Sequence, residues 1–107
     1  MTTTINTITE ETIAKLEGKG FRRWTQGRYD RLYINPKSYG VEYTYYKSGK
    51  VEGGTINGER FGACEARCFE GTKVYIDVTD GTLHIDTRTD FEDEIRANVE
   101  AIIAAAC

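Results

Sequence analysis

The segment Lys73–Arg88 constrains the fold most, because it has the pattern of a complete β-hairpin. Apolar and polar residues alternate on both sides of Asp80-Gly81, and an Asp-Gly pair between such runs is a strong signal for a two-residue type I′ turn. That turn predicts that Asp77 pairs with His84. The predicted buried row is Val74, Ile76, Val78, Leu83 and Ile85, and the predicted exposed row is Lys73, Tyr75, Asp77, His84, Asp86 and Arg88.

Two earlier segments also have the alternating pattern of a β-hairpin, and Phe21–Asn35 is the first of them. Phe21–Asn35 predicts strands on either side of Gln26-Gly27, with Trp24 opposite Tyr29 for a two-residue loop or opposite Arg31 for a four-residue loop. Both registers give the same two faces. The core face carries Phe21, Leu32 and Ile34, and the other carries Arg22, Trp24, Tyr29, Arg31 and Tyr33.

The tyrosine-rich run Val41–Lys47 predicts a strand that Ser48-Gly49 turns into Val51–Asn57. This pairing sets Tyr43 opposite Gly54 and Thr44 opposite Gly53. Glycine is a poor strand residue, but a large ring lying over it compensates.

Three helices complete the pattern. Thr9 is the expected N-cap of the first, which Gly18 and Gly20 end. A short helix is predicted over Phe61–Glu70. The last begins with the capping box Thr89–Glu92. Its apolar stripe is Phe91, Ile95, Val99, Ile102 and Ala106.

Together these elements predict one α+β domain over residues 1–107, with residues 1–7 a candidate for disorder. The expected core is one antiparallel meander sheet of about six strands, from hairpins near residues 21–35, 41–57 and 73–88. The N-terminal helix, the short middle helix and the amphipathic C-terminal helix pack on it. A chain of 107 residues is a common size for one domain.

Composition and charge indicate where the protein is located and what its surface is like. No apolar run is long enough for a membrane span, and no signal peptide precedes the first helix, so the expected location is the cytoplasm. Three cysteines argue against a secreted disulfide framework. The net charge of −3 divides into +4 over residues 1–50 and −7 over residues 51–107. This split suggests one basic face and one acidic face, and a mixed, solvated surface is an equally weighted alternative.

Few residues are candidates for catalysis or metal binding. The single histidine, His84, and Asp77 have the composition of a catalytic dyad, but no third member has an arguable position, and a cross-strand ion pair accounts for both. Cys64 and Cys68 share one side of the middle helix, where two thiolates could hold a metal with His84 and Cys107. Buried free thiols are the simpler interpretation. We therefore predict no catalytic residue, metal site or cofactor.

The first hairpin carries the strongest indication of function. Its outer face mixes guanidinium and aromatic groups, the residue types that dominate protein interfaces and that also contact phosphates and stack on bases. The alternative is that Trp24 packs under the helices with the arginines extended over it. The predicted partner-binding residues are Arg22, Trp24, Arg28, Tyr29, Arg31 and Tyr33.

Several short motifs carry a resemblance. They are Gly20-Phe21-x-Arg23-Trp24, Asp30–Asn35, Tyr45-Tyr46-Lys47-x-Gly49, Asn57-Gly58-Glu59, Ala66-Arg67 and Tyr75–Val78. In these the chain resembles small uncharacterised proteins carried by phages and other mobile elements of Gram-positive (Firmicutes) bacteria. The resemblance transfers no activity and implies only a setting, in which such accessory proteins often block host defence systems such as CRISPR.

The function expected from the sequence is therefore a non-enzymatic binding protein that acts stoichiometrically on a protein partner, as an anti-CRISPR-like inhibitor of host defence. The alternative is a nucleic-acid-binding accessory protein that uses the basic and aromatic face of the 21–35 hairpin. The exposed edges of a meander sheet also allow a homodimer, and no membrane partner is expected.

Overall fold

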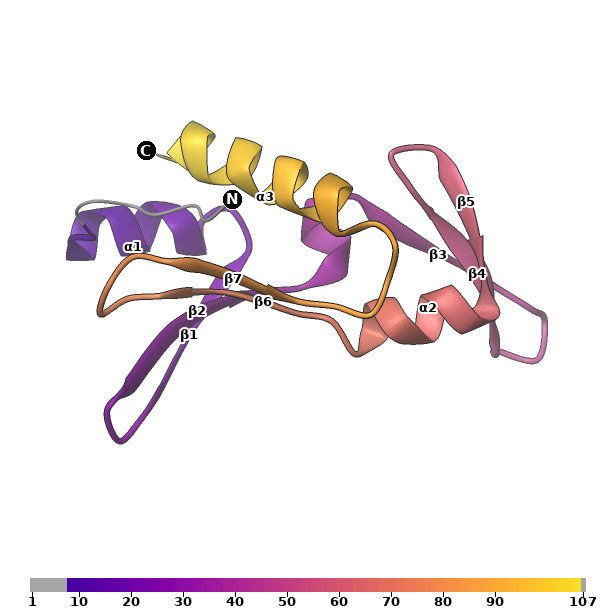
Figure 1. Ribbon diagram of the computed structural model, residues 1–107, viewed down its shortest axis with the longest axis horizontal. Coiled ribbons are helices and arrows are strands. Elements are labelled where there is room, and N and C mark those ends of the chain that lie inside the picture. Colours follow the sequence, from indigo (N-terminus) through magenta and orange to yellow (C-terminus); the bar gives the residue numbers. More distant parts are fainter. Residues whose placement is uncertain (1–7, 107) are drawn as a thin grey trace.

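The computed structural model describes residues 8–106; the disorder considered for residues 1–7 concerns a segment outside these. The molecule measures 44 × 26 × 23 Å, and α3 runs along its length (Figure 1). The order is α1 (Glu10–Glu17), β1 (Phe21–Gln26), β2 (Tyr29–Ile34), the 3-10 helix η1 (Pro36–Tyr39), β3 (Val41–Tyr45), β4 (Val51–Ile56), β5 (Glu59–Gly62), α2 (Ala63–Glu70), β6 (Lys73–Asp77), β7 (Leu83–Asp86) and α3 (Glu92–Ala106).

The α+β class is confirmed, but the single six-strand meander is wrong. The seven strands form a four-stranded sheet in the order β1-β2-β6-β7 and a three-stranded sheet in the order β3-β4-β5. η1 ends at Tyr39, and the next residue, Gly40, has a φ of +98° that redirects the chain between β2 and β3. β6 then takes the place beside β2, with Tyr33 opposite Tyr75.

The extra strand β5 replaces the predicted start of the middle helix. Asn57 and Gly58 have φ of 52° and 85°, and a type I′ turn requires positive values at both positions. The chain reverses there, and Phe61 pairs with Gly54 in β4. α2 therefore begins at Ala63 instead of Phe61, and it ends before Gly71 as predicted.

The first hairpin adopts one of its two predicted registers. Trp24 pairs with Arg31, and the pairing continues to Gln26 opposite Tyr29. The loop is Gly27-Arg28, and the φ of +59° at Gly27 fits a type II′ turn, which places glycine first. Both predicted faces are confirmed.

The register predicted for the 73–88 hairpin is wrong by two residues, since His84 pairs with Tyr75. The Asp77 Oδ1 accepts the N–H of Thr79 at 2.9 Å and the Asp80 Oδ1 accepts the N–H of Thr82 at 2.8 Å. These local bonds close a four-residue loop over residues 78–81 in place of the two-residue turn. Because the shift is an even number, every side chain keeps its predicted face.

The last helix begins at Glu92, not at Thr89. The Thr89 hydroxyl accepts the N–H of Phe91 at 3.2 Å, and the Glu65 carboxylate accepts the N–H of Asp90 at 3.1 Å. These bonds hold the residues of the predicted capping box in a turn before the helix.

One core runs through both sheets. α1 and α3 cover one face of the four-stranded sheet with Leu16, Ile95 and Val99, each fully buried (Figure 1). The Thr9 cap of α1 is confirmed by the bond from the N–H of Thr12 to its hydroxyl. In the three-stranded sheet, the Phe61 ring packs against Phe69 of α2, with centroids 4.6 Å apart.

Candidate functional site: the open face of the four-stranded sheet

The four-stranded sheet has one face that no described element covers. α1 and α3 lie on the same side of this sheet, and the β1–β2 hairpin extends beyond them (Figure 1). The opposite side exposes large side chains, with Trp24 at 41% and Tyr29 at 52% of their full exposure. We call this side the open face and define it by Arg22, Trp24, Tyr29, Arg31, Tyr33, Tyr75, Asp77 and His84.

The strand registers align these side chains in rows across the sheet. One row runs from Arg22 through Tyr33 and Tyr75 to His84. The adjacent row runs from Trp24 through Arg31 to Asp77. The open face therefore joins the two hairpins that the sequence treats as separate units.

The aromatic rings of the first row contact one another, and Trp24 of the adjacent row joins them. The Trp24 ring meets Tyr33 edge-on at 6.2 Å, and Tyr33 meets Tyr75 at 5.1 Å. The His84 imidazole then stacks on Tyr75 at 4.9 Å with an interplanar angle of 17°. Aromatic pairs at such separations stabilise one another beyond their buried area, so the rings are held in place before any partner arrives.

Arg31 is the centre of this cluster. Its guanidinium lies 4.7 Å from the Tyr29 ring centroid and 4.5 Å from that of Tyr75, and its Nη1 donates to the Tyr33 hydroxyl at 3.1 Å. The hydrogen bond to Tyr33, more than the nearby Asp77 charge, raises the pKa of Arg31 above its ordinary value. A cation held by cation–π contacts and a hydrogen bond has a fixed orientation.

The structure brings together most of the residues predicted for the site. Arg22, Trp24, Tyr29, Arg31 and Tyr33 share the open face, and Arg28 is exposed in the turn at its end. The alternative that Trp24 packs under the helices is wrong. Arg23 lies on the other face, where it bonds Asp30 at 2.7 Å and Glu10 at 3.1 Å.

Tyr75 and His84 were missing from the predicted site. Each was assigned to an exposed row, but the pairing that brings them beside Tyr33 joins β2 to β6 across a long insertion. No local pattern predicts that contact. The nearest signal is the similarity of Leu32–Asn35 to Val74–Asp77, two strands with one alternation of apolar and polar residues.

His84 remains near carboxylates despite the register shift. Ligand atoms of Asp77, Asp80 and His84 lie within 4.8 Å of one another, which makes them the group in residues 8–106 that could hold a metal ion. Each carboxylate already accepts a hydrogen bond from its own loop. The Thr82 N–H, more than the His84 charge, lowers the pKa of Asp80. Local turn geometry thus accounts for the positions of both carboxylates.

The prediction that Cys64 and Cys68 are buried thiols is wrong. Cys64 is exposed and Cys68 is half-buried on α2, and both are free. The remaining cysteine of the proposed ligand set, Cys107, lies outside the described residues.

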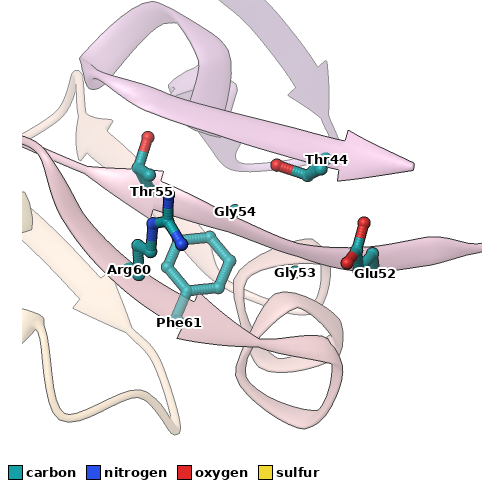
Figure 2. A pocket seen from close by; sticks show the side chains of 7 residues that line it. All are labelled: Thr44, Glu52, Gly53, Gly54, Thr55, Arg60 and Phe61. Carbon is teal, nitrogen blue, oxygen red and sulfur yellow. The ribbon is translucent and has the colours of Figure 1, made fainter. Parts of the chain in front are cut away.

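A separate hollow of about 420 Å³ lies on the three-stranded sheet. Figure 2 shows Gly53 and Gly54 between Thr44 and Glu52 on one side and Thr55 and Arg60 on the other. The predicted pairings of Tyr43 with Gly54 and of Thr44 with Gly53 are confirmed. A Cβ on Gly54 would lie 2.6 Å from the Phe61 ring, so Phe61 is the ring that compensates for this glycine. Close packing of β4 and β5 thus explains the glycines that form this hollow.

The fold and this face describe an α+β protein with one uncovered, aromatic and arginine-rich sheet surface. Comparison with models of protein families, with curated proteins and with solved structures gave no match. Among the helices of the described part of the chain, none has the length and apolar character needed to cross a membrane.

Proposed function

We propose that this chain is a non-enzymatic binding protein whose open face docks on a protein partner. The observation that carries this proposal is the rigid cluster of Arg31 with Tyr29, Tyr33 and Tyr75. Tyrosine, tryptophan and arginine dominate the energy of protein interfaces. Side chains already ordered in the free protein lose less entropy on binding.

The ring contacts favour a protein over a single-stranded nucleic acid. Single-strand binding relies on free ring faces on which bases stack. The Tyr75 ring is occupied by the His84 imidazole and by the Arg31 guanidinium. The open face also carries Asp77, beside Arg31 at the end of the row that begins at Trp24, and a carboxylate there opposes a phosphate backbone.

The charges on the open face indicate which groups the partner's surface carries. Arg22 on β1 and Arg28 in the β1–β2 turn are exposed, and they form no ion pair within residues 8–106. Asp77 lies further across the sheet, on β6. The complementary surface has carboxylates opposite β1 and β2 and an aromatic or apolar centre opposite Tyr33. A stoichiometric inhibitor of a host defence protein, the setting implied by the resemblance to phage and mobile-element proteins, is one activity that such docking would serve.

The test uses exposed tyrosines as a matched pair. Tyr29 is 52% exposed on the open face, and Tyr46 is 53% exposed beyond β3, outside the four-stranded sheet. Affinity capture from host lysate, followed by titration of the purified partner, should give a 1:1 complex. Trp24→Ala with Tyr29→Ala should weaken it by at least about thirtyfold, the effect of a single hot-spot truncation of about 2 kcal/mol. Tyr46→Ala should leave it unchanged.

Two results would contradict the proposal. One is a complex that the open-face variant binds as tightly as the wild type does. The other is tight, salt-dependent binding of a single-stranded oligonucleotide that the same variant loses. That result would identify the open face as a nucleic-acid-binding surface.

A further inference from the structure

A second hollow, of about 480 Å³, lies where the end of α2 meets the ends of β6 and β7. Three cations line it from three different segments: Arg67 of α2, Lys73 of β6 and Arg88 beyond β7. The single carboxylate in its lining is Asp86. The hollow thus carries a formal charge of +2 in a chain whose net charge is −3.

None of these cations is neutralised by its own chain within residues 8–106. Arg67, Lys73 and Arg88 are exposed and form neither an ion pair nor a side-chain hydrogen bond there. Asp86 pairs with Lys73 across the strands, yet the two form no ion pair. Like charges gathered at one hollow repel one another, and a bound anion would relieve that repulsion.

The wall of the hollow is held by a chain of hydroxyl groups. The Thr72 hydroxyl donates to the Cys68 carbonyl at 2.8 Å and lies 2.7 Å from the Thr87 hydroxyl, which lies 3.1 Å from that of Thr89. These bonds tie the end of α2 to the segment that follows β7. The lining residues of the two segments therefore keep fixed relative positions.

The end of a helix ordinarily repels an anion through its free carbonyl groups. Here three of the last four carbonyls of α2 are occupied. The Gly71 N–H bonds the Arg67 carbonyl and the Thr72 N–H bonds that of Phe69, both at 3.1 Å, while the Thr72 hydroxyl bonds Cys68. These bonds satisfy three of the carbonyl oxygens that would otherwise oppose an anion beside the three cations.

We propose that this hollow binds a phosphate monoester group. Such a group carries a charge of about −1.5 to −2 at neutral pH, which matches the formal charge of the hollow, whereas a phosphodiester carries one. The guanidinium forks of Arg67 and Arg88 fit two phosphate oxygens each. The source is either a small phosphorylated molecule or a phosphorylated side chain, and the site does not depend on the function proposed for the open face.

The direct test is an NMR titration with inorganic phosphate, with sodium chloride at matched ionic strength as the reference. The amide signals of Gly71, Thr87 and Arg88 should shift saturably, with a Kd of about 1 mM or below, as expected for a few charge-assisted bonds. Arg67→Gln with Arg88→Gln should weaken binding at least about tenfold. Arg60→Gln, which removes an exposed arginine from β5, should leave binding unchanged.

Two ligands distinguish the source. A phosphoserine peptide that binds at least tenfold more tightly than inorganic phosphate would identify a modified protein, and equal affinity would identify a small molecule. The proposal is overturned if chloride reproduces the shifts, if the double variant binds phosphate like the wild type, or if a dephosphorylated oligonucleotide occupies the hollow more tightly than either ligand.

A measurement on the unchanged protein covers the case in which the double variant does not fold. Cys68 lines the hollow, and Cys64 lies one turn earlier on α2, outside it. The positive field should raise alkylation by anionic iodoacetate relative to neutral iodoacetamide at Cys68 but not at Cys64, and phosphate should abolish the difference. Peptide mass mapping separates the sites, and equal ratios at both cysteines would contradict the positive field.

Discussion

The imidazole of His84 lies against the ring of Tyr75, with centroids 4.9 Å apart and planes inclined by 17°. This contact follows from the four-residue loop, which moves His84 two positions along β6, away from its predicted place opposite Asp77. The residue that resembled half of a catalytic dyad is thereby part of the aromatic row on the open face.

Replacing Tyr75 should therefore change the NMR signals of the imidazole. The chain has one histidine, so its ring protons are assigned without ambiguity. In Tyr75→Leu the ring-current shift from the stacked phenol should vanish and the signals should move downfield. Tyr29→Leu, which removes a ring with no contact to His84, serves as the control. If Asp77 were the true partner of His84, Tyr75→Leu would leave these signals nearly unchanged.

Local patterns predicted much of the fold because they depend on neighbouring residues. The Thr9 cap, the two faces of the first hairpin and the pairing of Tyr43 with Gly54 all follow from alternation and turn residues. The positions of the helices followed for the same reason, with errors of two or three residues at their starts.

The arrangement of strands could not be predicted in this way. Pairing of β2 with β6 joins two segments that η1, the three-stranded sheet and α2 separate in the sequence, so no local pattern contains it. The loop after Asp77 was misjudged because Asp77 and Asp80 bond nearby N–H groups and compete with the Asp-Gly turn. Five members of the candidate site were predicted as one face, whereas Tyr75 and His84 join it only through that distant pairing.

A methyl group at position 54 should destabilise the fold. In Gly54→Ala the new Cβ would clash with the Glu42 carbonyl oxygen of β3 and would lie 2.6 Å from the Phe61 ring of β5, so the backbone must move. We expect a loss of about 2–3 kcal/mol in the free energy of unfolding, the range for an overpacked core. Gly62→Ala in the same sheet is the control, since its Cβ meets nothing within 4 Å. Urea denaturation compares the two, and equal losses would refute the close packing of Gly54 against Glu42 of β3 and the Phe61 ring of β5.

Acid should selectively remove the contribution of Asp30. The bond from Arg23, outweighing partial desolvation, lowers the pKa of Asp30 below its ordinary value of 3.8. Asp30 thus stabilises the fold above pH 3.8, and this contribution is lost as the pH falls through the lowered folded-state pKa. Asp30→Asn should lower the urea midpoint at pH 7, and its difference from the wild type should shrink below pH 3.8.

A second measurement isolates the cause of that pH dependence. In Arg23→Gln, an NMR titration should find the pKa of Asp30 returned towards 3.8. Arg22→Gln, on the opposite face of β1, should leave that pKa as it is. A pKa unchanged by the loss of Arg23 would mean that another group stabilises the carboxylate.

Asn98 connects α3, which covers the four-stranded sheet, to the three-stranded sheet. Its Nδ2 donates to the Tyr39 carbonyl at 2.7 Å, just before β3, and to the Asn57 Oδ1 at 3.0 Å, in the turn between β4 and β5. In Asn98→Ala both acceptors lose their donor, and we expect a loss of about 1–3 kcal/mol in the free energy of unfolding. Denaturation followed in urea measures this loss.

Asn57→Gly separates the bond to Asn57 from the bond to Tyr39. It removes one amide, but it suits the positive φ of 52° at this turn position, so its loss should be smaller than that of Asn98→Ala. If the two variants lose the same free energy, the bond to the Tyr39 carbonyl contributes nothing. If Asn98→Ala is as stable as the wild type, apolar packing alone sets the angle between α3 and the three-stranded sheet.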